Sequence, residues 1–306
     1  MRSLESDPRC GDCLRGLAGS AVRLALGAEG APRAAEMEKR ALDLLDRGLA
    51  LGQASPVIAN RMLREITRIS GTRDPYAAFK AQELERARSV FSAVAPDVRP
   101  GDLRSCLSLA VLGNTLDFFR DPGEVLEEIP GLLRAGLRFD RDDIDLLERF
   151  LAERPRHILY LTDNSGEAYF DLPLYEALSG RSERCTLVVK GGPSLNDLTR
   201  EELRLSGLDG RFSDVADTGT EGAGIDWERV SSSFRALVQE ADLVLCKGMA
   251  NFETVYPEAL PAASFYLFRV KCEPIRDMAG VPVGGFAALW KGGSRQRAGG
   301  GREEKT

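Results

Sequence analysis

The most informative feature of this 306-residue sequence is its shortage of histidine, because His157 is the only one. A metal site built from several histidines is therefore excluded, as is any mechanism that needs two imidazole groups. A Ser-His-Asp triad would have to use His157, which precedes the apolar residues 158–161. In an open α/β sheet that is the wrong end of a strand for an active site, so we interpret His157 as a polar residue at a strand entrance.

Long apolar runs and an excess of basic charge are also missing. No apolar run approaches the roughly 20 residues of a membrane-spanning helix, and residues 1–7 lack the apolar core of a signal peptide. Asp and Glu number 47 against 41 Lys and Arg, for a net charge of −6, whereas binding to nucleic acid needs clustered basic residues. We therefore expect a cytoplasmic protein with neither a membrane nor a nucleic acid as partner, whose six cysteines are mostly thiols.

Residues 1–153 carry the apolar spacing of helices. Met37, Ala41 and Leu45 fall on one helical face. Ser55-Pro56 is typical of a helix start, with Ser55 as the N-cap, and Gly71 is typical of a helix end. The pattern predicts a helical N-terminal domain over 1–153, with further helices over 102–119, 122–134 and 140–153.

From residue 154 the pattern changes to short apolar runs that alternate with amphipathic segments. Each run is almost continuously hydrophobic, as in parallel strands that are covered on both faces. The predicted strands are 157–162, 185–190, 212–217, 243–246 and 265–270, and the predicted helices are 169–179, 197–205, 231–241 and 252–260. We expect the α/β class, with a Rossmann-like α/β/α three-layer domain over 154–290 whose sheet is mostly parallel, and a disordered tail over 291–306.

Polar residues follow four of the predicted strands, at the edge where an open parallel sheet binds its ligands. Three of them, Asp163, Asn164 and Asp197, offer oxygen atoms, which are the ligands that Mg²⁺ and Mn²⁺ prefer. Asp163 and Asn164 are neighbours in the chain, so both can reach one ion only if the backbone turns sharply there. The sequence therefore predicts a divalent-cation site made by two loops.

Further residues at the same edge suit a phosphate group. A turn at Ser165-Gly166 would let a helix begin near Glu167, and the free N–H groups of a helix N-terminus favour an anion. Lys247 adds a positive charge, as a phosphoryl group needs. The sequence contains no G-x-x-x-x-G-K-[ST] loop and no G-x-G-x-x-G after the first strand. These observations indicate phosphoryl chemistry, or phosphate binding, by another type of site.

Taken together, these loops resemble the "domain of unknown function eighty-nine" proteins, also called damage-control phosphatases or acidic-residue-methyltransferase-like proteins. The resemblance runs from about residue 9 to 285. It rests on Leu161-Thr162-Asp163-Asn164-Ser165-Gly166-Glu167, Gly191-Gly192-Pro193, Asn196-Asp197, Asp217-Thr218-Gly219, Lys247-Gly248 and Asn251-Phe252-Glu253. The N-terminal half adds Cys10-Gly11-Asp12-Cys13, which matches the prokaryotic branch, and Asp74-Pro75-Tyr76, Gly113-Asn114 and Asp117-Phe118. Lys271-Cys272 matches a late cysteine.

The resemblance implies metal-dependent hydrolysis of phosphate monoesters, such as sugar phosphates or damaged phosphometabolites. By the resemblance, Asp163, Asn164 and Asp197 bind a divalent metal ion, which we expect to be Mn²⁺, Co²⁺, Ni²⁺ or Mg²⁺, and Lys247 contacts the phosphate. The expected partner is a small phosphorylated metabolite.

We expect the metal ion and Lys247 to stabilise the charge on the phosphoryl group as the ester bond breaks. Asp163 is expected to act in catalysis as well as in metal binding. Four residues are predicted to help bind the substrate: Asn164, Glu167, Lys247 and Asn251. Asp217 and Glu253 are both candidate bases, and the sequence does not choose between them, nor between a water and a carboxylate as the attacking group.

The role of the cysteines is open, and so are two alternative functions of the protein. Cys10 and Cys13 have a spacing that suits zinc or redox chemistry, with Cys272 as a third thiolate, but two small residues on a packed helix would give the same pattern. If the pair opens a helix, the field of the helix would lower a thiol pKa. The alternative activity is an S-adenosylmethionine-dependent carboxyl methyltransferase, because the family has also been described in that way. A protein that binds phosphometabolites without catalysis is the other alternative.

Overall fold

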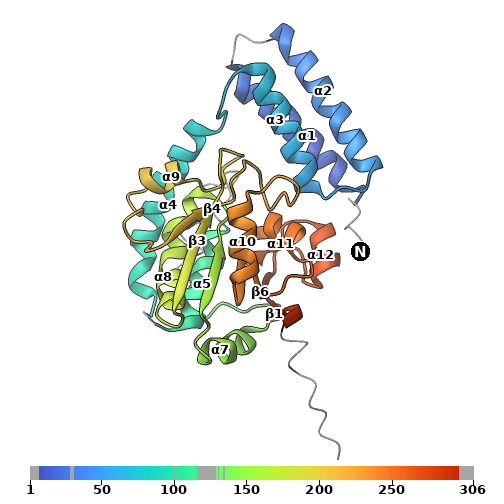
Figure 1. Cartoon of the computed structure of the whole chain (residues 1–306). Coiled ribbons are helices and arrows are strands. Elements are labelled where there is room, and N and C mark those ends of the chain that lie inside the picture. Colours follow the sequence, from blue (N-terminus) through green and yellow to red (C-terminus); the bar gives the residue numbers. More distant parts are fainter. Residues whose placement is uncertain are drawn as a thin grey trace, which may run out of the picture.

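The computed structural model describes residues 7–27, 31–99, 101–115, 129, 131–133 and 135–295. Over these residues, no helix combines the length and the apolar character needed to cross a membrane. Figure 1 shows a sheet with helices on both of its faces and, above it, a bundle of three helices at the N-terminal end of the chain. The α/β class predicted from the sequence is confirmed.

The described residues form one seven-stranded sheet in the order β1-β7-β6-β5-β2-β3-β4. Every pairing is parallel except that of β6 with β7, so the predicted mostly parallel sheet is confirmed. The strands are β1 (Arg141–Asp142), β2 (His157–Leu161), β3 (Arg184–Val189), β4 (Val215–Asp217), β5 (Leu243–Lys247), β6 (Ala263–Arg269) and β7 (Phe286–Lys291). Strand β2 lies between β3 and β5 and is buried along its whole length.

Helices cover both faces of the sheet because successive side chains of each strand point to opposite sides. Ile158 and Tyr160 of β2 pack into one core, and Leu159 and Leu161 pack into another. The first core includes residues of α4 (Ala77–Val94), α5 (Leu103–Gly113), α7 (Ile144–Ala152), α8 (Ala168–Ser179) and α9 (Arg200–Leu205). The second includes residues of α10 (Ser232–Glu240), α11 (Gly248–Val255) and α12 (Glu273–Ala279). There are also two short 3₁₀ turns. η2 (Ala95–Asp97) follows α4, and η3 (Ser165–Glu167) directly precedes α8.

The three N-terminal helices have a core of their own. Helices α1 (Cys10–Leu26), α2 (Ala31–Ala50) and α3 (Ser55–Ser70) bury the apolar stripe that the sequence indicated, including Met37, Ala41 and Leu45. Gly71 ends α3 in a left-handed conformation, as predicted, with φ of 76°. Helices α4 and α5 instead share their core with the sheet. A division of the chain at residue 153 stays a prediction.

Several predicted elements differ at their boundaries. Ser55 does not cap α3, since it is the first helical residue and Ala54 precedes it without a side-chain hydrogen bond. The strand predicted from 212 begins only at Val215, and the helix predicted from 197 begins at Arg200, where the Thr199 side chain caps it. These differences arise because an apolar run extends into a turn when a residue such as Phe212 packs into the core from outside the strand.

Two strands at the far edge were not predicted. β1 occupies the start of the predicted helix 140–153 and has only two residues, both exposed, so it carries no apolar pattern. β7 pairs antiparallel with β6 and ends at Lys291, the first residue of the predicted tail. The remaining tail from residue 296, most of the predicted helix 122–134, and the motif Asp117-Phe118 lie outside the described residues.

Candidate active site

The predicted loops meet at the carboxyl edge of the sheet, between β2 and β5. After β2 the chain enters η3 and α8 on one face, and after β5 it enters α11 on the other face. The chain thus leaves two neighbouring parallel strands in opposite directions, and this arrangement opens a crevice where α/β proteins bind their ligands. The N-termini of α8 and α11 both begin at this crevice, and their N–H groups favour an anion there.

The structure brings Asp163, Asn164 and Asp197 together from two loops. Asn164 and Asp197 form an antiparallel bridge. The Leu198 N–H donates to the Asp163 carbonyl at 2.9 Å, and the Ser165 N–H donates to the Asn196 carbonyl at 2.8 Å. Backbone hydrogen bonds therefore fix the two loops against each other, which is the arrangement that a shared ion requires.

The two aspartates lie in an environment that disfavours their negative charge. Burial, with the nearby Glu167 and Asp197 charges, raises the pKa of Asp163 well above its usual range. Burial raises the pKa of Asp197 to about 7, against the opposing effect of the Lys190 charge. The Asp197 side chain is 3% exposed, and its Oδ2 accepts no hydrogen bond from any described residue. Buried carboxylates of this kind need a cation close by in order to ionise.

Asn114 at the end of α5 and Glu83 of α4 form hydrogen bonds with the two loops that carry Asp163 and Asp197. Asn114, which caps the C-terminus of α5, donates from Nδ2 to Asp163 Oδ2 at 2.9 Å and to Glu167 Oε1 at 2.7 Å. Glu83 of α4 is buried and accepts from Asn196 Nδ2 at 3.3 Å. Burial and the Glu167 charge raise the pKa of Glu83 well above its usual range. The sequence indicated Asn114 only through the resemblance, and gave no sign of Glu83.

Lys247 lies at the end of β5 with no exposed surface, and two buried carboxylates surround its ammonium group. Its Nζ donates to Glu167 Oε2 at 2.8 Å and to Asp171 Oδ1. Burial raises the pKa of Asp171 to about 6 and opposes the charge of Lys247, but the two carboxylates outweigh this and raise the pKa of Lys247. Burial likewise opposes the charge of Glu167, whose pKa is lowered by Lys247. The three side chains form a buried cluster of one ammonium group and two carboxylates.

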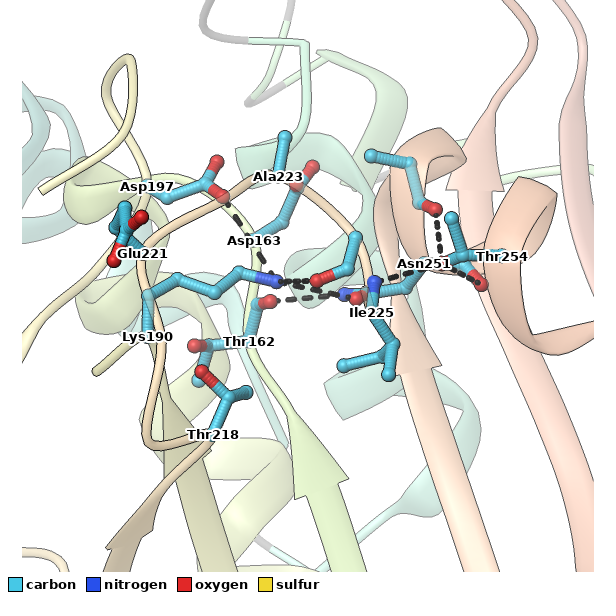
Figure 2. Close-up of polar contacts among 12 residues, drawn as sticks. Thr162, Asp163, Lys190, Asp197, Thr218, Glu221, Ala223, Ile225, Asn251 and Thr254 are labelled. Carbon is cyan, nitrogen blue, oxygen red and sulfur yellow. Dashed lines mark hydrogen bonds and ion pairs between the residues drawn. The ribbon is translucent and has the colours of Figure 1, made fainter. Parts of the chain in front are cut away.

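Lys190 is a second buried lysine, which the sequence reasoning did not select although it begins the Lys190-Gly191-Gly192 loop. Figure 2 shows its side chain reaching across the site toward Asp197 and Asn251. Nζ donates to the Gly224 carbonyl at 2.8 Å and to Asn251 Oδ1 at 3.3 Å, and it lies 3.8 Å from Asp197 Oδ2. Unlike Lys247, it is therefore held mainly by neutral oxygen atoms.

Lys271 is an exposed lysine that follows β6 and was also not selected. Its positive charge lowers the pKa of both Asp163 and Glu167, so its field reaches these carboxylates. Its ammonium group forms no ion pair with another described residue, and its backbone N–H donates to Met249 Sδ at 3.3 Å. Within the described residues, Lys271 is therefore an exposed cation without an ion-pair partner.

The other predicted site residues occupy different positions. Asn251 is fully buried and donates to the Thr162 and Lys247 carbonyls at 2.9 and 2.7 Å, so its side chain ties β2 to α11. Asp217 pairs with Arg200 at 3.0 Å and lines a cavity that also contains Lys190. Glu253 lines a separate cavity against the α2–α3 turn, and burial raises its pKa to about 7.

Gly248 allows β5 to approach Asp163 closely. Its φ is +76°, in the left-handed region, and a Cβ at this position would overlap the Asp163 carboxylate. Only glycine fits both the conformation and the space. His157, by contrast, is the first residue of β2, is buried, and lies 2.8 Å from Thr186 Oγ1, in agreement with its interpretation as a polar residue at a strand entrance.

The oxygen atoms of the site fit a divalent cation. Among the residues that the structure describes, no donor reaches Oδ2 of Asp197, and the hydrogen bonds of Asp163 and Asn164 from Asn114 and to Glu167 use Oδ2 and Nδ2. Asn164 uses its Nδ2 to bind Glu167 Oε1 at 2.7 Å, which turns its amide oxygen away from Glu167. Within the same residues, no group of three or more His, Cys, Asp or Glu side chains is arranged to hold a metal ion, so a metal site here would have to include the Asn164 amide oxygen.

Cys10 and Cys272, two of the cysteines with a predicted metal or redox role, lie where α1 meets α12. Cys10 begins α1 and Cys272 precedes α12, and Arg9 joins the two helices through ion pairs with Glu273 at 3.1 Å and Asp277 at 2.6 Å. The expected lowering of a thiol pKa is wrong for Cys10, because burial raises its pKa, as it does for Cys272. All six cysteines are free, and a metal or redox role for them stays a prediction.

Comparison with known proteins agrees with this geometry. The chain is 30% identical over 292 residues to a damage-control phosphatase of Archaeoglobus fulgidus, which covers 93% of this chain and 99% of that protein. It is 31% identical over 285 residues to the damage-control phosphatase PH1575 of Pyrococcus horikoshii, covering 91% and 96%. A crystal structure of a DUF89 family protein from Pyrococcus horikoshii matches with a TM-score of 0.79 and 28% identity, covering 92% of this chain and 98% of that one.

The match to the family itself extends over most of the chain. Residues 8–285 match the damage-control phosphatase ARMT1-like domain, almost the same span as the resemblance seen in the sequence. The loops that carried the resemblance include those that follow β2 and β5 and the Asn196-Asp197 turn, which bonds to the loop after β2. The chain therefore belongs to the family of ARMT1-like damage-control phosphatase domains.

Proposed function

We propose that this protein is a metal-dependent phosphatase that hydrolyses phosphate monoesters of small metabolites. The observation that carries the proposal is the buried Asp197 carboxylate, which adjoins Asp163 and Asn164 at the crevice between β2 and β5 and whose Oδ2 accepts from no donor in the described part of the chain. Membership of a phosphatase family supports the same reaction. The free cysteines agree with the predicted cytoplasmic location, which stays a prediction.

Asp163, Asn164 and Asp197 would hold the cation, which we expect to be Mn²⁺, Co²⁺, Ni²⁺ or Mg²⁺. Such an ion, when bound, polarises a phosphoryl oxygen and neutralises the charge of the transition state. Oxygen ligands from carboxylates and an amide are the set that these harder cations accept. Without a cation, the raised pKa values of Asp163 and Asp197 leave the pair partly protonated at neutral pH.

The lysines of the site divide into two roles in this proposal. Lys271 has an exposed ammonium group with no ion-pair partner in the described part of the chain, so it can contact the phosphate directly. Lys247, which was predicted to make that contact, is occupied by Glu167 and Asp171 and acts as a positioning residue that keeps these carboxylates charged. Glu167 in turn accepts from Asn114 and Asn164, and so orients the residues around Asp163.

The proposal assigns the base to Asp217 and no catalytic role to Glu253. Asp217 lines the cavity that reaches Lys190 and loop 191–193, beside the proposed phosphate site. Its Oδ1 accepts from the Gly219 N–H at 3.0 Å and its Oδ2 from Arg200, which holds the carboxylate in one orientation. Glu253 lines a different cavity, which shares no lining residue with the cavity at Asp217.

Release of phosphate from p-nitrophenyl phosphate tests the proposed function. The wild-type protein should lose activity with EDTA and regain it with Mn²⁺. Asp163→Asn should lose roughly 100-fold or more of kcat even at saturating Mn²⁺, because the site then lacks one charged ligand. Asp209→Asn is the matched control, since Asp209 is exposed and lies in a distant loop.

Full activity after removal of all divalent ions, or full activity of Asp163→Asn, would contradict the proposal. Stabilisation of the protein by phosphate esters without any release of phosphate would favour the alternative of a non-catalytic binding protein. Transfer of a methyl group to carboxylates without phosphatase activity would favour the methyltransferase.

A further inference from the structure

Two neighbouring cavities lie between the N-terminal helices and the loops after β3 and β4. One of about 450 Å³ is lined by Lys190 and Asp217, and the other, of about 470 Å³, is lined by residues of α3. Both include Arg73 and loop 191–193 in their walls, so they adjoin on either side of this loop. Volumes of this size hold a small metabolite. The proposed function does not assign a role to the second cavity.

The charged residues of the second cavity are mainly arginines. Arg64, Arg68 and Arg73 line it, against one carboxylate, that of Glu221. Arg68 is paired with Glu65 at 2.8 Å, whereas Arg73 is exposed and forms no ion pair with another described residue. Glu221 lies 3.4 Å from Arg229 and 3.9 Å from Arg64. The cavity therefore keeps an excess of positive charge in a protein whose net charge is −6.

Arg64 carries the strongest sign of a missing ligand. Its side chain is 22% exposed, and its Nη1 is a buried atom with no hydrogen-bond partner in the described part of the chain. The nearest carboxylates lie at 3.6 Å (Asp226) and 3.9 Å (Glu221), too far for hydrogen bonds. Burial lowers its pKa, with Arg229 adding repulsion. An unsatisfied buried guanidinium N–H is unfavourable, and an anion that accepted from it would remove the penalty.

Ser194 adds a neutral donor to the same cavity and connects it to the active site. The side chain is 7% exposed, and its Oγ is buried without a hydrogen-bond partner among the described residues. Its carbonyl accepts from the Asp197 N–H at 3.0 Å, so the turn that carries Ser194 also fixes Asp197. A ligand in this cavity would thus lie one short loop away from the proposed cation site.

We propose that the cavity lined by Arg64, Arg73 and Ser194 binds a second anionic group of the substrate. This inference rests on the proposed phosphatase function and names its substrate class. The preferred substrates are small phosphate monoesters that carry a carboxylate or a second phosphate at the end opposite to the phosphate that is hydrolysed. Bidentate binding by an arginine suits both groups, whereas a sugar alcohol end offers only neutral hydroxyl acceptors and therefore binds the guanidinium less strongly.

Matched substrate pairs test this inference. Gluconate 6-phosphate and sorbitol 6-phosphate differ only in a carboxylate at C1, and fructose 1,6-bisphosphate and fructose 6-phosphate differ in a second phosphate. The wild-type protein should show a kcat/KM roughly tenfold or more higher for the anionic member of at least one pair, since a charge-assisted hydrogen bond is worth that much. The pair with the larger ratio identifies the second group as a carboxylate or a phosphate.

Variants of the cavity make the test specific. In Arg64→Gln and Arg73→Gln the ratio within that pair should fall toward one, mainly through KM, because these residues act on binding. Arg47→Gln, an exposed arginine of α2 outside the cavity, should keep the wild-type ratio. Circular dichroism and the Tm of each variant check that the fold is retained.

The outcomes separate the two proposals. If the wild-type protein releases no phosphate from any ester, the proposed function fails. If it hydrolyses p-nitrophenyl phosphate but shows no preference within either pair, the second anion site is wrong. A preference that survives unchanged in both arginine variants would also overturn it, because the anion would then bind elsewhere.

Discussion

Two buried lysines at the same edge of the sheet have different surroundings. Lys247, at the end of β5, is bound by the carboxylates of Glu167 and Asp171, so its charge is cancelled within the protein. Lys190, just after β3, is held by a carbonyl and an amide oxygen, and the nearest carboxylate is Asp197 at 3.8 Å. The comparison teaches that the position of a lysine at the end of a strand does not by itself show that it binds the substrate. The partners of its ammonium group decide its role.

The largest expected effect separates the two lysines by stability. Lys247→Met leaves two buried carboxylates without a cation, so it should lower the free energy of unfolding by about 3–5 kcal/mol. Lys190→Met removes hydrogen bonds to neutral oxygen atoms and should cost about 1–3 kcal/mol. Guanidinium unfolding of both variants measures the difference.

A double variant is the control for this prediction. Adding Asp171→Asn to Lys247→Met removes one of the two buried charges and should recover part of the lost stability. Equal losses for the two lysine variants would show that the carboxylates around Lys247 do not hold its charge in the way described.

A third lysine sharpens the comparison through activity. Lys271→Met removes an exposed ammonium group beside Asp163, so stability should change by less than about 0.5 kcal/mol. The kcat/KM for p-nitrophenyl phosphate should fall roughly tenfold or more, because the phosphate loses a charged contact. Steady-state kinetics together with Tm measure both quantities. If the Lys271→Met variant keeps wild-type kinetics, Lys271 does not contact the phosphate, and the contact predicted for Lys247 is favoured instead.

The smallest expected effect concerns Glu253, a half-buried carboxylate of α11 that forms no ion pair with another described residue. Burial raises its pKa to about 7 in the folded protein, above its ordinary value of 4.5. The folded state therefore binds the proton more tightly than the unfolded state, and the resulting stability is present below pH 4.5 and lost as the pH rises through 7.

Glu253→Gln keeps the shape of the protonated group and does not titrate. Relative to the wild type, the variant should gain about 1–2 kcal/mol in the free energy of unfolding between pH 5 and pH 8. Urea unfolding at the two pH values measures this gain. An equal difference at both pH values would mean that the carboxylate is solvated in the folded protein.

The sequence predicts the loops of the site well and their partners poorly. Strand ends in a parallel sheet must share one edge, so Asp163 and Asp197 could be placed near each other from the order of the apolar runs alone. The pairing of Lys247 with Asp171 could not, because Asp171 lies on α8, where a carboxylate in the first turn is ordinarily a solvated helix residue. Arg64 was missed for a similar reason, since a charged residue on an amphipathic helix usually faces water.

The prediction of the strands is limited in the same way. Apolar runs locate β2, β3, β5 and β6, which are buried strands, but β1 has two exposed residues and no pattern to detect. β7 has a clear apolar run, 286–290, but nothing in the run shows that it pairs antiparallel with β6. Local patterns thus predict elements that bury a continuous face, whereas edge strands and long-range ion pairs depend on the assembled chain.

Calorimetric titration of Mn²⁺ into chelator-treated protein tests the central claim most directly. The wild-type protein and the exposed control Asp209→Asn should each bind one ion per chain at the site of Asp163, Asn164 and Asp197. In Asp197→Asn the affinity should be roughly 100-fold or more lower, because a charged ligand is lost. Undiminished binding of one ion by Asp197→Asn, or no binding by the wild-type protein, would contradict the account.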